Sequence, residues 1–116
     1  MKIPAFSLSQ LTKAGDKEII PKIIMQINKD LQLSGNQYGI DQNCSAQLLV
    51  SDLRKIIENL LQTDFSGLLN LFYRIDVPES LLQKMMEETP EDLPQNLTLL
   101  ILKKEWLKVW IRNKSL

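Results

Sequence analysis

The residues best suited to chemistry lie in a short box where one expected helix ends and the next begins. The box reads Leu71-Phe72-Tyr73-Arg74-Ile75-Asp76-Val77-Pro78-Glu79. Two carboxylates beside an arginine could form an acid–base pair or part of a Mg²⁺ site. The same residues suit a helix junction, because Asp76 and Glu79 favour a helix start and Arg74 favours a helix end. We therefore interpret the box as capping plus an ion-pair network, and assign no catalytic, cofactor-binding or metal-binding residue.

A second group of charged residues lies near the C-terminal end of the sequence. Lys104, Lys108 and Arg112 follow one another at intervals of four, which places them on one face of a helix. Such a row could contact nucleic acid or another anionic partner. Trp106 and Trp110, also four apart, are typical of a core face. Because the chain has 14 basic and 14 acidic residues, nucleic-acid binding is disfavoured and a solvated face is the simpler interpretation.

The composition excludes several kinds of active site. The sequence contains no histidine, so a Ser-His-Asp or Cys-His site and a His-ligated zinc or iron site cannot form within one chain. The single cysteine, Cys44, cannot form an internal disulfide or a thiolate cluster. The glycines form no phosphate-binding motif. An enzyme is therefore disfavoured, and we expect no cofactor.

Length and composition indicate a single domain. At 116 residues, with 44% hydrophobic and 24% charged side chains, the chain can fold without metal or disulfide staples. Its first residues contain no apolar segment typical of a secretory signal peptide. The longest uninterrupted apolar run, at residues 99–102, is too short to span a membrane. We therefore expect a cytoplasmic protein that has no membrane partner.

Apolar residues spaced by three and four predict a series of helices. The first is expected to begin near Pro21, after a separate turn at residues 16–20, because a proline removes a backbone donor. Gly35 ends this helix by adopting a left-handed conformation. Residues 34–43 then form the one long loop, which we interpret as a plain connector anchored by Tyr38 and Ile40.

Capping residues place the later helices. Ser45 caps the second helix, and Asp64 caps a short apolar helix that follows it. A further helix starts at Pro78, with Asp76 as its capping side chain. The last long helix starts between residues 90 and 94 and continues through the row of cations described above.

These elements predict an all-α fold: a single-domain bundle of about four to five antiparallel helices with a loose N-terminal arm. Residues 1–15 form the arm, residues 16–113 the bundle domain and residues 114–116 a C-terminal tail. Charge is distributed unevenly along the bundle. Residues 77–102 contain five acidic residues and one basic residue, net −4, whereas residues 103–116 contain five basic residues and one acidic residue, net +4. In an antiparallel pack the two regions could face one another.

The box at residues 71–79 resembles one found in a family of small, uncharacterised, all-helical bacterial proteins. The closing helix is similar to the ending of the same family, through Leu100-Ile101-Leu102-Lys103-Lys104-Glu105, Lys108-Val109 and Arg112. The resemblance covers residues 45–112. It implies a helical fold in a cytoplasmic, bacterial setting, and the family carries no assigned activity. It also suggests one network between the box and the last helix, in which Arg74 reaches Glu105.

The sequence thus favours a protein-interaction or structural module over an enzyme. Its partner would be another protein or a second copy of the chain. The candidate network consists of Arg74, Asp76, Glu79, Glu105, Lys108 and Arg112. Two alternatives remain open. One is a carboxylate-based or metal-assisted hydrolase around Asp76, Glu79 and Glu105, and the other is weak nucleic-acid binding through the basic C-terminal helix.

Overall fold

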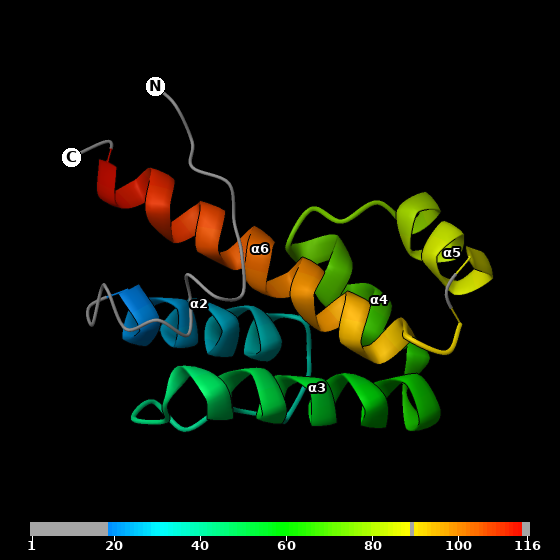
Figure 1. The fold of residues 1–116 in the computed structure, drawn as a ribbon, viewed down its shortest axis with the longest axis horizontal. Coiled ribbons are helices and arrows are strands. Elements are labelled where there is room, and N and C mark those ends of the chain that lie inside the picture. The colour runs from blue at the N-terminus through cyan, green and yellow to red at the C-terminus, as the bar shows by residue number, and fades with distance from the viewer. Residues whose placement is uncertain (1–18, 89, 115–116) are drawn as a thin grey trace.

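Five helices make up the part of the chain that the structure, a computed structural model, describes, namely residues 19–88 and 90–114. They are α2 (Ile19–Leu33), α3 (Ala46–Thr63), α4 (Phe65–Arg74), α5 (Glu79–Glu88) and α6 (Leu93–Lys114) (Figure 1). The described residues contain no strand. The expectation of an all-α, single-domain bundle is therefore confirmed, whereas the N-terminal arm at residues 1–15 and residues 115–116 of the tail lie outside the described residues.

The first described helix, α2, begins two residues before Pro21, earlier than the sequence predicts. Pro21 is tolerated there because backbone N–H groups in the first turn have no partner within the helix. The helix ends as expected at Gly35, whose φ of 87° is left-handed. The backbone N–H of Asn36 donates to the carbonyl of Leu31 over 2.9 Å, which closes the helix end.

The connection from α2 to α3 turns back along α2, so these two helices run in the same direction (Figure 1). Asn28 fixes this path, because its side-chain amide donates to the carbonyl of Ile40 and accepts from the Ile40 N–H, both over 2.8 Å. Further on, the side chain of Gln42 donates to the carbonyl of Pro21 at the start of α2. The prediction of antiparallel neighbours does not hold for this pair, because a loop of this length can return along the whole helix. Ile40 is buried, as an anchor should be.

Asp64 joins α3 to α4 by ending one helix and capping the next. Its backbone N–H donates to the carbonyl of Leu60, and its carboxylate accepts from the N–H of Gly67 over 3.0 Å. The side-chain amide of Asn36 donates to the carbonyl of Gly67, which ties the α2–α3 loop to the start of α4. The predicted caps at Ser45 and Asp64 are both confirmed, since each side chain accepts a backbone hydrogen bond.

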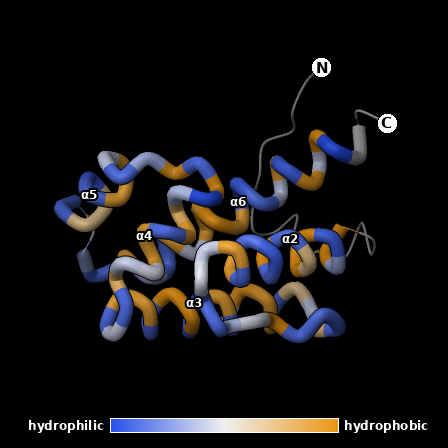
Figure 2. The backbone as a smooth tube through the Cα atoms, turned by 180° about the vertical axis from the view of Figure 1, so that it is seen from behind, coloured by the Kyte–Doolittle hydropathy of each residue, from blue (hydrophilic) through white to orange (hydrophobic). Residues whose placement is uncertain are grey.

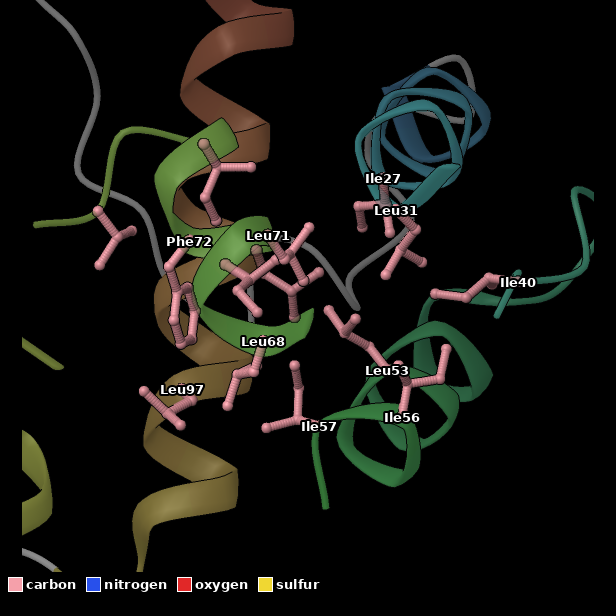
Figure 3. Packing of buried hydrophobic residues seen from close by; sticks show 14 of the residues in the cluster. Ile27, Leu31, Ile40, Leu53, Ile56, Ile57, Leu68, Leu71, Phe72 and Leu97 are labelled. Atoms are coloured by element: carbon pink, nitrogen blue, oxygen red, sulfur yellow. The ribbon is translucent and has the colours of Figure 1, made fainter. Parts of the chain in front are cut away.

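The core forms where α2, α3 and α4 converge against α6 (Figure 3). Ile27, Leu53 and Phe72 come from three different helices and are all almost fully buried. Hydrophobic and hydrophilic segments alternate along α3, as expected for a helix with one face in a core (Figure 2). By contrast, α5 lies at one end of the molecule, and Leu82 is its only fully buried side chain. The bundle therefore has a tightly packed body and one shallowly attached helix.

We predict that Gly67→Ala lowers the free energy of unfolding by up to about 1 kcal/mol. An unconstrained helical glycine would gain about 1 kcal/mol from the same change. Here the added methyl group would overlap the Asp64 carboxylate and lie 3.0 Å from the side-chain oxygen of Asn36. The cap must then be displaced, which costs about 1–2 kcal/mol.

Gly39→Ala is the matched control for this prediction. Its methyl group would lie 3.7 Å from the Asn28 side chain, an ordinary contact, so its stability should stay within about 0.5 kcal/mol of wild type. Urea denaturation of the three proteins measures both effects. A stabilised Gly67→Ala variant would show that the contacts around Asp64 do not constrain this position.

Candidate functional site

Two carboxyl groups are buried where the C-terminal half of α6 crosses α2. Asp30 on α2 is 0% exposed and Glu105 on α6 is 1% exposed. Gln26, one helical turn before Asp30, is also buried. Burying a charge costs several kcal/mol unless a partner compensates it. The partners of these two groups therefore define the site.

Asp30 is surrounded by donors from three helices. Its carboxylate accepts from the side-chain amide of Gln26 over 3.1 Å and forms ion pairs with Arg74 of α4 at 3.4 Å and Lys108 of α6 at 3.3 Å. Burial alone would raise the pKa of Asp30. Hydrogen bonds from Glu105, Gln26 and Lys108, with the charge of Lys108, outweigh burial and lower that pKa below its ordinary value. Asp30 is therefore the charged member of the pair.

Glu105 is the neutral member. Neither of its side-chain oxygens receives a hydrogen bond from a donor in the described part of the chain. Burial, followed by the neighbouring Asp30, raises the pKa of Glu105 to about 8, against smaller opposing effects of Lys108 and Arg112. Two ionised carboxylates cannot hydrogen-bond each other, whereas a protonated Glu105 can donate to Asp30. The pair therefore holds one proton at neutral pH.

A groove of about 410 Å³ lies beside this pair, between α2 and α6. It is lined by Lys22, Met25, Gln26, Lys29, Val109 and Arg112. The guanidinium of Arg112 donates to the side-chain oxygen of Gln26 over 3.2 Å. Gln26 thus bridges the groove to the buried pair, because its amide nitrogen donates to Asp30.

A second groove, of about 280 Å³, lies between α4 and α5 at the other end of the molecule. Its lining consists of Phe65, Leu69, Glu79, Leu82, Gln83, Met86 and Glu87. Four of these side chains are apolar and two are acidic, and none is basic. This groove is therefore apolar with a negatively charged rim.

The structure brings together only part of the predicted network. Arg74, Glu105 and Lys108 meet around Asp30, and Arg112 joins them through Gln26. The predicted contact of Arg74 with Glu105 is replaced by the ion pair of Arg74 with Asp30. Lys108 and Arg112 of the predicted solvated row also contact residues of α2, while Lys108 is half-buried and Arg112 stays exposed. Lys108 of this row is paired with the Asp30 carboxylate, which leaves one cation fewer for nucleic-acid binding through α6.

Asp76 and Glu79 lie outside this cluster, on the exposed corner between α4 and α5. Asp76 does not occupy the capping position of α5, because that helix begins at Glu79 and is preceded by Pro78. Asp76 instead has a φ of 64° and ends α4 in the left-handed conformation. The N–H of the next residue, Val77, donates to the carbonyl of Phe72 over 2.8 Å, as in a glycine-type helix end. Glu105 is buried whereas Asp76 and Glu79 are exposed, so these three carboxylates do not share one environment.

Asp30 and Gln26 are the site residues that sequence reasoning missed. A signal was present, since both polar residues fall among the apolar positions of α2, next to Ile27 and Leu31. Glu105 likewise falls between Leu102 and Val109 on the apolar face of α6. Polar residues on two packed apolar faces can satisfy each other, although a backbone group can also serve as the partner, as the Pro94 carbonyl does for buried Thr98.

The acidic and basic regions do not face one another. Figure 1 shows α5 and the start of α6 at one end of the molecule and the C-terminal end of α6 at the other. Within α6 the basic residues begin ten positions after Leu93, about 15 Å along the helix at 1.5 Å per residue, and continue to its C-terminal end. The two regions, which could have faced one another in an antiparallel pack, therefore lie toward opposite ends of the molecule.

Neither a metal cluster nor a membrane span is found in residues 19–88 and 90–114. In that part of the chain, no three cysteine or carboxylate side chains are arranged to hold a metal ion. The helices described there also lack the combined length and apolar character needed to cross a bilayer. Comparison with family models, curated proteins and solved structures gives no match. The functional proposal therefore rests on the geometry of the two grooves and the buried pair.

We predict that Asp76→Gly raises the free energy of unfolding by about 0.5–1 kcal/mol, because glycine adopts a positive φ without strain. Asp76→Ala, the matched variant, should lower stability by a similar amount. Both changes remove the same carboxylate and differ only in how well the new residue tolerates a φ of 64°. Thermal denaturation of both variants distinguishes an effect of the backbone φ from an effect of the carboxylate. Equal losses of stability in both variants would mean that the carboxylate itself stabilises the fold.

We also predict that stability falls as pH rises from 5 to 9. The folded-state pKa of Glu105, about 8, lies above its ordinary value of 4.5, so the folded protein binds a proton that the unfolded chain releases. Stability from this proton is complete below pH 4.5 and lost progressively as pH rises to about 8. The difference between these two pKa values corresponds to a loss on the order of 4 kcal/mol between pH 5 and 9. Because the sequence contains no histidine, few other groups titrate in this window.

Urea denaturation at several pH values checks this prediction. Glu105→Gln, which keeps a neutral side chain of the same size, should remove most of the slope between pH 5 and 9. Glu58→Gln is the control, because Glu58 lies on the outer face of α3 and pairs only with Arg54 among the ion pairs found. If wild type and Glu105→Gln have the same slope, Glu105 does not carry the proton.

Proposed function

We propose that this protein is a small helical protein-interaction module. Its binding surface is the groove between α4 and α5, and its partner is a cationic, amphipathic segment of another protein. The observation that supports this most directly is the composition of the groove, which combines four apolar side chains with two carboxylates. Apolar patches surrounded by polar or charged residues often mark interaction surfaces.

The apolar side chains of the groove are accessible. Phe65 and Met86 are each 38% exposed, although both are large hydrophobic residues. Leu69 and Leu82 line the same groove and pack toward the core. A volume of about 280 Å³ is enough for one large anchoring side chain. Such an anchor in a small pocket is typical of interaction hot spots.

The shallow attachment of α5 also supports the proposal. Only Leu82 of this helix is fully buried, and Leu81 and Met85 are half-buried. A helix with few buried apolar side chains opens at a lower free energy than the body of the bundle. We therefore expect α5 to adjust its position when a partner side chain enters the groove.

Charge favours a cationic partner. Glu79 and Glu87 line the groove, and Lys84 is the only basic residue in the region 77–102, whose net charge is −4. Complementary charge accelerates encounter and selects against acidic partners. A second copy of the chain fits less well, because Lys108 of its basic end is already paired with Asp30 of α2.

We also propose a cytoplasmic, bacterial setting for this protein. The resemblance of residues 45–112 to small bacterial helical proteins suggests a bacterial, cytoplasmic protein that acts by binding. Cys44 suits a reducing compartment, since it is a free thiol. Burial is the main cause that raises its pKa, so the thiol is less reactive than an ordinary cysteine.

We predict that a fluorescent helical peptide of leucine and lysine, with one tryptophan anchor, binds the groove with micromolar affinity. Met86→Lys places a cation at the rim and should weaken binding at least tenfold. Leu48→Lys is the control, because Leu48 is an exposed apolar residue of α3 that does not line the groove. Fluorescence anisotropy at low salt measures the dissociation constants.

Two results would contradict the proposal. One is equal binding by Met86→Lys and Leu48→Lys, and the other is equal binding of a peptide in which glutamate replaces every lysine. Light scattering on the free protein tests the alternative partner. A concentration-dependent dimer that Met86→Lys disrupts would assign the groove to a second copy.

A further inference from the structure

We propose that the groove between α2 and α6 is a binding site for a small organic oxyanion, a phosphate or carboxylate carried on a short apolar group. This site is separate from the α4–α5 groove and does not depend on the function proposed for it. The volume of about 410 Å³ is in the range of small-molecule sites. Its lining and the buried pair beneath it define what it can bind.

The two helices supply complementary halves of the groove. Lys22, Met25, Gln26 and Lys29 of α2 are spaced by three, one and three residues, so they share one helical face. Val109 and Arg112 of α6 lie opposite them. The site thus rests on two packed helices rather than on a loop, which keeps its geometry fixed.

The lining carries three positive side chains and, among the described residues, no negative one. Beneath it, the single charge of Asp30 is matched by Arg74 and Lys108. Glu105 contributes no charge while it is protonated. Among the described residues, the groove and the buried site beneath it thus contain more cations than charged carboxylates, which favours an anionic ligand.

Gln26 prepares Arg112 to bind an anion. It is buried, its amide nitrogen donates to Asp30, and its oxygen accepts from the Arg112 guanidinium. Because Gln26 holds the guanidinium at the groove, less conformational entropy is lost when a ligand binds. The planar fork of arginine suits the two oxygens of a carboxylate or phosphate.

The apolar part of the ligand would contact Met25 and Val109. Met25 is 62% exposed, and its flexible thioether can adapt to different apolar groups. An inorganic anion would leave Met25 in water. We therefore expect a ligand with an apolar group to bind more tightly than sulfate or phosphate alone.

Ionisation of Glu105 should weaken this binding, because it adds a negative charge beneath the cations. The charged groups that act on Glu105 are Asp30 on α2 and Lys108 and Arg112 on α6. Arg74 of α4 pairs with Asp30, and Lys22 and Lys29 of α2 line the groove. The charged residues of α3, which also packs on α6, are Asp52, Arg54, Lys55 and Glu58, all at exposed or half-buried positions. By linkage, a bound anion also makes Glu105 hold its proton more tightly.

Calorimetry at pH 6.5 and low salt tests the site, with phenyl phosphate and benzoate as probes and benzyl alcohol as the uncharged control. We expect at least one anionic probe to bind with submillimolar affinity and benzyl alcohol to bind at least tenfold more weakly. Comparison of phenyl phosphate with benzoate decides which oxyanion is preferred. Failure of both anions to bind at millimolar concentration would overturn the proposal.

Lysine-to-glutamine variants test whether the anionic probe binds in the α2–α6 groove. Lys22→Gln/Lys29→Gln should weaken the better probe at least tenfold without changing the melting temperature by more than about 3 °C. Lys55→Gln, an exposed lysine of α3, is the control and should bind as wild type does. Equal affinities for the double variant and the control would show non-specific attraction and overturn the proposed site.

The dependence of anion binding on the ionisation of Glu105 can be measured separately. Phenyl sulfate keeps a constant charge between pH 6.5 and 9, so it isolates changes in the protein. Its affinity for wild type should fall several-fold over this range, and its affinity for Glu105→Gln should stay nearly constant. If both proteins show the same slope, the anion site is not coupled to Glu105.

Discussion

The fold depends on a carboxylate that has no access to water. Asp30 is fully buried, and a buried charge is costly unless it is paired and hydrogen-bonded. The charge of Asp30 is paired with Arg74 of α4 and Lys108 of α6, and Gln26 of its own helix donates a hydrogen bond to it. A slip of α6 along α2 by one turn would move Glu105 away from Asp30 and put an apolar residue, Ile101 or Val109, in its place. The buried site therefore selects one register for helices whose apolar faces alone could pack in several.

The same site explains why the two ends of the molecule differ. The cations at the C-terminal end of α6 are used in part to hold α2, through Lys108 and Arg112. None of the ion pairs found in residues 19–88 and 90–114 involves an acidic residue of α5, and α6 carries the basic region to the opposite end (Figure 1). The basic end is consequently part of the stable body of the bundle. The acidic end, with one fully buried side chain in α5, is the end that can rearrange.

Local patterns predicted most of the fold. Helix spacing located α3, α4, α5 and α6, and the capping roles of Ser45 and Asp64 were correct because those hydrogen bonds link residues only a few positions apart. The direction of α3 was not predictable in this way, since it depends on the contacts of Asn28 with Ile40, twelve residues away. Asp76 was misassigned because an aspartate after a helix suits both a cap and a left-handed helix end. Only its φ distinguishes the two roles.

The candidate site was harder to predict, since its central residue binds partners 44 and 78 positions away in the sequence. Glu105, Lys108, Arg74 and Arg112 could be named from their charge, but their shared partner could not. Only the placement of polar residues on two apolar helix faces pointed to Asp30 and Gln26. That pattern indicates a buried contact without specifying which cations complete it.

The absence of histidine does not leave this chain without a proton carrier near neutral pH. Residue type sets only the starting pKa, and burial beside Asp30 moves Glu105 into the range that histidine usually occupies. The burial that raises the pKa also keeps the carboxyl group from contacting a substrate, since Glu105 is 1% exposed. Its proton can therefore influence the molecule only through the α2–α6 interface and the groove beside it. For this reason the buried pair is better understood as a charge that tunes a binding surface than as an acid in an active site.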